Sequence, residues 1–178
     1  MYSAMHAANP SGGSNNYFWM NGGIGDVAFP VHRHLSVVGE WAGHSIMGGR
    51  LPSNPTAGLS LISGMGGVRV RIPTRSLFQP YAQALIGGAH GFNSYFMVNN
   101  CAYYTLCAQK GPTSYDSGFN MALGAGVDLA VSKHVWIRVV QTDYSYTVFR
   151  NTVGNRQNNF RVSGGLVFRL PDVLYLKK

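Results

Sequence analysis

Apolar and polar residues alternate along this chain over segments longer than an ordinary strand. Over residues 119–131 every second residue is apolar, whereas the residues between them are small or polar. A period of two is typical of a strand with two different faces, and strands in globular proteins usually have about 5–6 residues. The same alternation recurs over residues 35–45, 60–72, 78–90 and 160–170. The pattern therefore predicts long, two-faced strands.

Three further segments have a less regular pattern. Residues 17–29 are aromatic and glycine-rich, and residues 2–8 look like the end of a strand whose beginning is missing. In residues 135–149, Arg138 has the wrong parity for the polar face. This predicts either a β-bulge near residues 139–140 or a position at the rim for Arg138. No segment shows the 3.6-residue period of a helix. The patterns together predict seven full strands and an incomplete first strand.

The links between these strands alternate between short and long. Short links cover residues 30–34, 73–76 and 132–134, and long links cover residues 9–16, 47–58, 92–117 and 150–158. Short turns at one rim and long loops at the other are typical of outer-membrane barrels. The expected fold is all-β, an eight-stranded antiparallel up-and-down transmembrane β-barrel with an incomplete first strand. It forms one domain over residues 1–178, with a core at about residues 2–170 and a C-terminal tail at 171–178.

The composition favours a surface that is not entirely exposed to water. Charged residues make up 11% of the chain, under half of the roughly 25% that is usual in soluble domains. Glycine (23), tyrosine (10) and phenylalanine (9) are abundant instead. No stretch approaches the roughly 20 consecutive apolar residues that a membrane-spanning helix needs. A membrane protein of this composition would therefore cross the bilayer with strands.

The net charge is strongly positive, with 14 basic and 6 acidic residues and a formal charge of +8. Such an excess can indicate nucleic-acid binding. However, the basic residues are dispersed along the chain, and the only adjacent pair is Lys177 and Lys178. An anionic membrane surface suits dispersed charge equally well. We expect no nucleic-acid partner.

Two kinds of barrel fit the alternation. A soluble, lipocalin-like barrel would enclose a hydrophobic ligand, but the outer face of residues 120–130 would then be too uncharged for water. A membrane barrel turns its apolar face to lipid, and its small lumen residues leave room for arginine and tyrosine side chains. Aromatic residues are then expected at both lipid–water levels. Those expected on the short-turn side are Phe78, Trp136 and Phe168, and those on the loop side are Phe18, Trp19, Phe119, Tyr144, Tyr146 and Phe160.

Several segments, mostly from Gln79 onward, carry a family resemblance. They read QPYAQALIGGA at 79–89, GAGVD at 124–128, RVVQTDY at 138–144 and NNFRVSGGLVFR at 158–169. With these segments the chain resembles the bacterial OmpA-like, opacity-type outer-membrane barrels over nearly its whole length. The resemblance implies an outer-membrane location and a role in envelope integrity, adhesion or contact with a host. Family members begin with a signal peptide and a complete first strand, so an N-terminally truncated member is expected.

Charged and amide side chains on the polar face form the main candidate site. An unpaired buried charge is costly, so acids and guanidinium groups should interlock as pairs. The expected lumen polar network consists of Glu40, Arg69, Arg71, Asp128, Gln141, Asp143 and Arg161. Asp143 is the first candidate for the partner of Arg161. Such a network either plugs and stiffens the barrel or, if the arginines exchange partners, gates a small pore.

Other residue groups do not form an active site or a metal site. Ser36, Glu40 and His44 share one strand face, but a spacing of four residues separates successive members by about 13 Å, beyond hydrogen-bond reach. His32 and His34 alone make a poor metal site. The glycine runs lack the following lysine and helix of a phosphate-binding loop. We expect a non-enzymatic protein with no cofactor and no metal.

The longest link carries a candidate contact surface. Cys101 and Cys107 are close enough in sequence for a local disulfide if the loop is exported to an oxidising compartment, and two free thiols are the alternative. A small ring would present Tyr103, Tyr104 and Tyr115 as an amphipathic patch, a composition typical of contact surfaces. The expected partners are outer-membrane lipid and an extracellular partner of the 92–117 loop. The barrel is expected to be a monomer.

Overall fold

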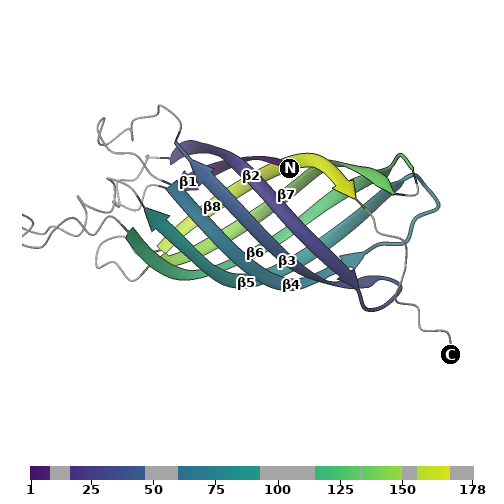
Figure 1. The fold of residues 1–178 in the computed structure, drawn as a ribbon, viewed down its shortest axis with the longest axis horizontal. Helices are drawn as coiled ribbons and strands as arrows, with labels where there is room; N and C mark the ends of the chain where they lie inside the picture. The colour runs from purple at the N-terminus through teal and green to yellow at the C-terminus, as the bar shows by residue number, and fades with distance from the viewer. Residues whose placement is uncertain (9–16, 47–59, 93–114, 133, 150–155, 169–178) are drawn as a thin grey trace, which may run out of the picture.

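A computed structural model of the chain describes residues 1–8, 17–46, 60–92, 115–132, 134–149 and 156–168. The strands are β1 (Tyr2–Ala8), β2 (Tyr17–Pro30), β3 (Leu35–Ser45), β4 (Ser60–Arg71), β5 (Phe78–Phe92), β6 (Tyr115–Ala130), β7 (Val135–Phe149) and β8 (Arg156–Phe168). Each strand pairs with its sequence neighbours, and β1 also pairs with β8, which closes the barrel (Figure 1). The predicted eight-stranded antiparallel up-and-down barrel is confirmed. No helix in the described ranges is long and apolar enough to cross a membrane.

The three short turns lie together at one end of the barrel. They join β2 to β3, β4 to β5 and β6 to β7, and the tilted strands bring all three to the same rim (Figure 1). Backbone hydrogen bonds span all three: the Val31 N–H donates to Leu35 O at 3.0 Å, the Ile72 N–H to Pro80 O at 2.9 Å, and the Val131 N–H to Val135 O at 3.3 Å. The predicted division into a short-turn rim and an opposite rim is therefore confirmed.

The first strand is short, as the sequence predicted. It has 7 residues, against 14 in β2 and 13 in β8. Its pairing starts at Tyr2, opposite Gly23 and Gly164. Met1 continues this contact, because its amino group donates to Ile24 O at 2.8 Å. The short strand still closes the ring, so its backbone groups pair on both sides, which a barrel in lipid requires.

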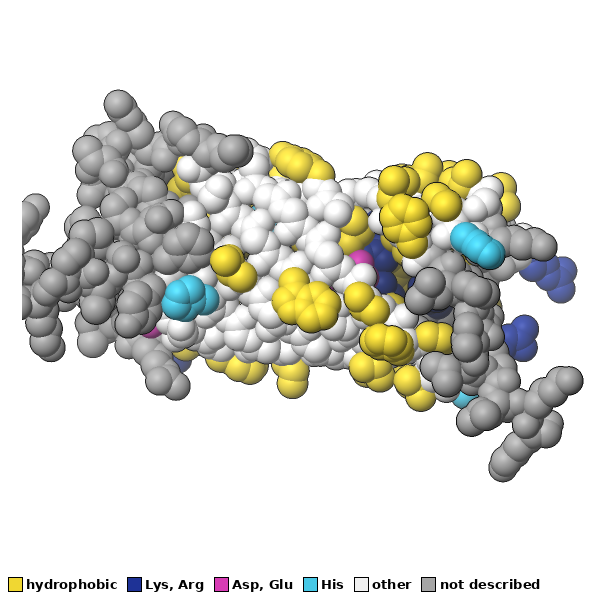
Figure 2. All heavy atoms as spheres, viewed as in Figure 1, with side chains coloured by type: hydrophobic (Ala, Val, Ile, Leu, Met, Phe, Trp, Pro, Cys, Tyr) yellow, Lys and Arg dark blue, Asp and Glu magenta, His cyan; other side chains and the backbone are white. Residues whose placement is uncertain are grey.

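The two faces of the wall have opposite chemistry. Apolar side chains project from the outside at several places along the wall (Figure 2), and the side chains of Ile86 and Leu123 are 64% and 53% exposed. Large exposed apolar residues on the outer wall include Trp19, Val37, Trp41, Ile62, Val68, Val70, Ile86, Phe119, Leu123, Tyr144, Phe160 and Leu166. The interior instead buries many polar and charged residues. This distribution is the reverse of that in a soluble protein. A large exposed apolar surface indicates an interaction with lipid or with another protein.

Two apolar clusters also lie inside the barrel. One consists of Met5, Ala7, Phe18, Met20, Leu61, Ala89 and Phe149, and the other of Val38, Met65, Leu85 and Ala122. The placement of Phe18 at the outer lipid–water level was wrong. Tyr17 and Trp19 are exposed on the outside, so strand alternation turns Phe18 inward. Trp136 is likewise only half-exposed and shares the inward parity of Arg138.

A β-bulge in β7 explains the irregular parity of this strand. Val127 of β6 pairs with Val140 and Asp128 pairs with Arg138, so Val139 is the extra residue. The register with β8 shifts at the same place, between Arg138 and Gln141. Of the two predicted alternatives, the bulge is confirmed. It places two consecutive valines on the outside and allows both Arg138 and Gln141 to face the lumen.

Candidate functional site

Arg161 joins two acids that come from different walls of the lumen. Its Nη2 lies 2.6 Å from Glu40 Oε1 and 2.8 Å from Asp143 Oδ2, and its Nε donates to the same Asp143 oxygen at 3.1 Å. Asp143 is on the adjacent strand β7, whereas Glu40 is on β3, which is not a neighbour of β8. All three side chains are almost completely buried. Arg161 therefore ties opposite parts of the wall together.

A second cluster forms around Asp26. Its carboxylate contacts Arg69 Nη2 at 2.5 Å and Arg138 Nη1 at 3.2 Å, and Arg138 Nε lies 2.8 Å from Asp128 Oδ1. The ring of Tyr81 lies against both guanidinium groups, with 4.6 Å from its centroid to Arg69 Cζ and 4.9 Å to Arg138 Cζ. Such cation–π contacts are favourable when desolvated. Tyr81 thus separates two like charges while it attracts both.

Glutamine side chains connect the two clusters. Gln83 accepts from Arg69 Nη2 at 2.7 Å and donates to Asp143 Oδ1 at 2.9 Å. Gln141 accepts from Arg138 Nη1 at 2.7 Å and donates to Asp143 Oδ2 at 2.8 Å. The lumen network is therefore continuous and consists of Asp26, Glu40, Arg69, Tyr81, Gln83, Asp128, Arg138, Gln141, Asp143 and Arg161. Every strand from β2 to β8 contributes to it.

Six of the seven residues expected in the lumen belong to this network. The seventh, Arg71, lies two residues beyond Arg69 on the same face of β4 and is half-buried. Asp143 is bonded to Arg161 as the sequence suggested. Asp26 was missed because the glycines before it carry no parity signal, although its register opposite Glu40 sets its direction. Arg138, Tyr81 and Gln83 were also missed as members, although Tyr81 and Gln83 lie on the polar side of the alternation in residues 78–90.

Glycines in β6 create the space that this network occupies. Gly124 pairs with Asp143 and Gly126 pairs with Tyr81 in adjacent strands. A Cβ atom added at Gly124 would overlap the Asp143 carboxylate, and one at Gly126 would lie 2.5 Å from the Tyr81 Cζ and Oη atoms. The large side chains of β5 and β7 therefore cross over a strand that has no side chains of its own at these positions.

This arrangement predicts that Gly126→Ala destabilises the barrel by about 1–3 kcal/mol, the usual cost of overpacking. The added methyl group would force Tyr81 away from the two guanidinium groups. Gly25→Ala is the matched control, because a Cβ at Gly25 meets no atom within 4 Å. The free energy of unfolding, followed by tryptophan fluorescence in urea, checks both variants. Equal stability of the two would show that Tyr81 does not need this space.

A Ser–His contact lies in the lumen. His44 Nε2 lies 2.9 Å from Ser3 Oγ, and Ser3 is completely buried. Glu40 does not join this pair and instead binds Arg161. Within the described ranges, no three His, Cys, Asp or Glu residues come close enough to hold a metal ion.

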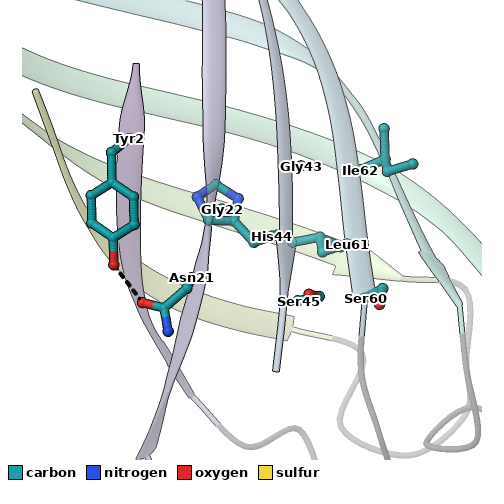
Figure 3. A pocket seen from close by; sticks show the side chains of 9 residues that line it. All are labelled: Tyr2, Asn21, Gly22, Gly43, His44, Ser45, Ser60, Leu61 and Ile62. Atoms are coloured by element: carbon teal, nitrogen blue, oxygen red, sulfur yellow. Dashed lines mark hydrogen bonds between the residues drawn. The ribbon is translucent and has the colours of Figure 1, made fainter. Parts of the chain in front are cut away.

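The wall has an open depression of about 510 Å³ between β1 and β4 (Figure 3). It is lined by Tyr2, Asn21, Gly22, Gly43, His44, Ser45, Ser60, Leu61 and Ile62. Its two titratable side chains are already bonded: the Tyr2 hydroxyl donates to Asn21 Oδ1 at 2.7 Å, and His44 contacts Ser3.

The expected disulfide and contact patch cannot be placed. Cys101, Cys107, Tyr103 and Tyr104 lie outside the described residues. Tyr115 begins β6, and its side chain is not described.

Comparison with known proteins supports the fold. No family model matches the chain. A search of curated proteins also finds no match. Neisserial surface protein A superposes with a TM-score of 0.67 at 16% identity, covering 93% of this chain and 92% of that one. Ail, the attachment invasion locus protein of Yersinia pestis, crystallised with the heparin analogue sucrose octasulfate, superposes with a TM-score of 0.56 at 16% identity, covering 95% and 94%. The chain therefore has the fold of the eight-stranded outer-membrane β-barrel proteins.

Proposed function

We propose that the chain is a bacterial outer-membrane barrel with a blocked lumen, which acts at the cell surface and has no catalytic activity. The observation that carries this proposal is the inverted chemistry of the wall. The exterior is largely apolar, and the interior holds one continuous network of charged and amide groups beside its two apolar clusters. The role then lies in envelope integrity or in surface contact through the segments opposite the short-turn rim.

A soluble lipocalin-like barrel is the weaker alternative. In such a barrel the apolar side chains of Trp41, Ile86 and Leu123 would be in water, because each is more than half exposed. It would also need an apolar cavity for its ligand. Arg161 and Glu40 bond across the interior instead, at the place where such a ligand would lie.

A small gated pore is the other alternative, and it predicts a measurable current. Opening would require Arg161 to leave both Glu40 and Asp143, and Arg69 to leave Asp26. Because an eight-stranded barrel has an interior just wide enough for its own side chains, we expect no steady ion current from the reconstituted protein in planar lipid bilayers. Discrete, reproducible conductance steps in the wild type would contradict the blocked lumen.

The segments opposite the short turns suggest a class of surface partner. Residues 9–16, 47–59, 93–114 and 150–155 contain Arg50, Lys110 and Arg150 and no acidic residue. Charge of this sign attracts polyanions, and Ail was crystallised with a heparin analogue. We expect the folded barrel to bind sucrose octasulfate in calorimetry and Lys110→Gln with Arg150→Gln to weaken this binding. Lys177→Gln with Lys178→Gln, which removes the same number of basic residues outside these segments, is the control. Binding that the loop variant leaves unchanged would exclude these segments as the partner site.

A further inference from the structure

The acidic and basic side chains that the structure places in the lumen balance each other in number. Four of the six acidic residues, Asp26, Glu40, Asp128 and Asp143, face the interior. Four arginines share this interior face: the buried Arg69, Arg138 and Arg161 and the half-buried Arg71. The interior is thus balanced. The rest of the sequence contains ten basic and two acidic residues and therefore carries the whole formal charge of +8.

The three short turns carry part of this charge, and their sequences contain no acid. Arg33 and Arg75 are exposed at the turns between β2 and β3 and between β4 and β5. The third turn contains Lys133 in its sequence, and none of the segments 30–35, 72–78 and 131–135 contains Asp or Glu. Figure 2 shows basic side chains projecting from this end of the barrel.

Apolar side chains flank the basic residue of each turn. Val31 lies two residues before Arg33, and Leu77 lies two residues after Arg75; they are 65% and 66% exposed. Val131 occupies the equivalent place in the third turn and is also exposed. Apolar side chains at the edge of the hydrocarbon region with a basic residue just beyond them are typical of a lipid–water interface. The arginines therefore lie where lipid headgroups would be.

The second turn holds its arginine in an ordered frame. The Thr74 hydroxyl donates to Phe78 O at 2.5 Å, and Gln79 Nε2 donates to Ser76 O at 3.1 Å. In the third turn, Ser132 Oγ accepts from the Val135 N–H at 3.0 Å. A turn that is already ordered loses less conformational freedom when it binds a ligand.

From these observations we infer that the short-turn rim is a collar that binds anionic phospholipid headgroups in the adjacent leaflet. This inference rests on the membrane location proposed above. Arg33 and Arg75 lie on separate turns around the rim and not in one pocket, which suits many headgroups of a leaflet and not one compact anion. Guanidinium groups bind phosphate oxygens in a bidentate manner, and each basic residue near an anionic surface strengthens association roughly fivefold.

The test measures lipid selectivity by electron spin resonance of spin-labelled phosphatidylglycerol and phosphatidylcholine around the folded protein in phosphatidylcholine bilayers. We expect the wild type to prefer phosphatidylglycerol several-fold at low salt and to lose this preference as salt rises. The double variant Arg33→Gln, Arg75→Gln should lose most of it. Arg156→Gln is the matched control, because Arg156 is exposed on β8 at the opposite rim.

The possible outcomes separate the collar from the membrane location. If motionally restricted lipid is present but shows no preference, or if the double variant keeps the preference, the collar is wrong and the membrane location stands. If the Arg156→Gln control alone loses the preference, the site lies at the other rim and the collar is wrong. Displacement by inorganic phosphate beyond that by chloride at equal ionic strength would indicate a free-phosphate site instead. If no restricted lipid appears, the membrane location itself fails.

Discussion

Arg161→Met lowers the free energy of unfolding by about 3–5 kcal/mol, the cost of removing one partner from a buried ion pair. The substitution keeps much of the side-chain volume but leaves Glu40 and Asp143 facing each other without their shared cation. Equilibrium unfolding in urea, in phospholipid vesicles, measures the loss. Arg156→Met is the matched control on the same strand, and we expect a change below about 1 kcal/mol because Arg156 is exposed.

A double-mutant cycle separates the contribution of the pair from general damage. Arg161→Met combined with Asp143→Asn should lower the free energy of unfolding by less than the sum of the single changes. Once one charge of the pair is gone, removing the other no longer leaves its partner buried and unpaired. The same non-additivity is expected with Glu40→Gln, although Glu40 is 121 residues away in the sequence. Additive effects for both acids would mean that Arg161 does not hold the network together.

Leu123→Arg destabilises the barrel by about 2–4 kcal/mol if β6 crosses a bilayer, because this is the cost of a basic side chain near the membrane midplane. Leu123 lies in the middle of β6, faces outward between Ala84 and Tyr144, and is 53% exposed. In a soluble barrel the same position would face water, and an arginine there would change stability little. The sign and size of this one effect therefore distinguish the two kinds of barrel.

Val131→Arg provides the depth control for this prediction. Val131 is also exposed but lies at the turn that follows β6, where a basic residue should cost only about 0–1 kcal/mol. Both variants are compared by unfolding in the same vesicles. Equal effects at Leu123 and Val131 would contradict a bilayer centred on the strands.

The strands themselves could be predicted because each one separates two different environments. A strand between lipid and a polar interior needs apolar and polar side chains to alternate along its whole length. This alternation is visible in the sequence over residues 119–131. The shortness of β1 and the bulge in β7 were also visible, since both interrupt the expected pattern. Phe18 was misplaced because three aromatic residues follow one another there, and only two of them can face outward. Tyr17 and Trp19 are exposed on the outside, so Phe18 between them faces inward.

The partners within the lumen could be predicted only in part. Asp143 and Arg161 lie on adjacent strands, so strand order alone makes them candidates. The bond from Arg161 to Glu40 depends on how the closed barrel brings β3 opposite β8, which no local pattern encodes. The position of Asp26 between Arg69 and Arg138 depends on the register of a glycine-rich strand and on the bulge that turns Arg138 inward.

The most direct test of the membrane assignment is fractionation of the protein after export to the envelope of a Gram-negative bacterium. The apolar outer wall predicts recovery in the outer-membrane fraction, extraction only with detergent, and migration on a gel that changes when the sample is boiled. Recovery of the folded protein in the soluble fraction without detergent would contradict it.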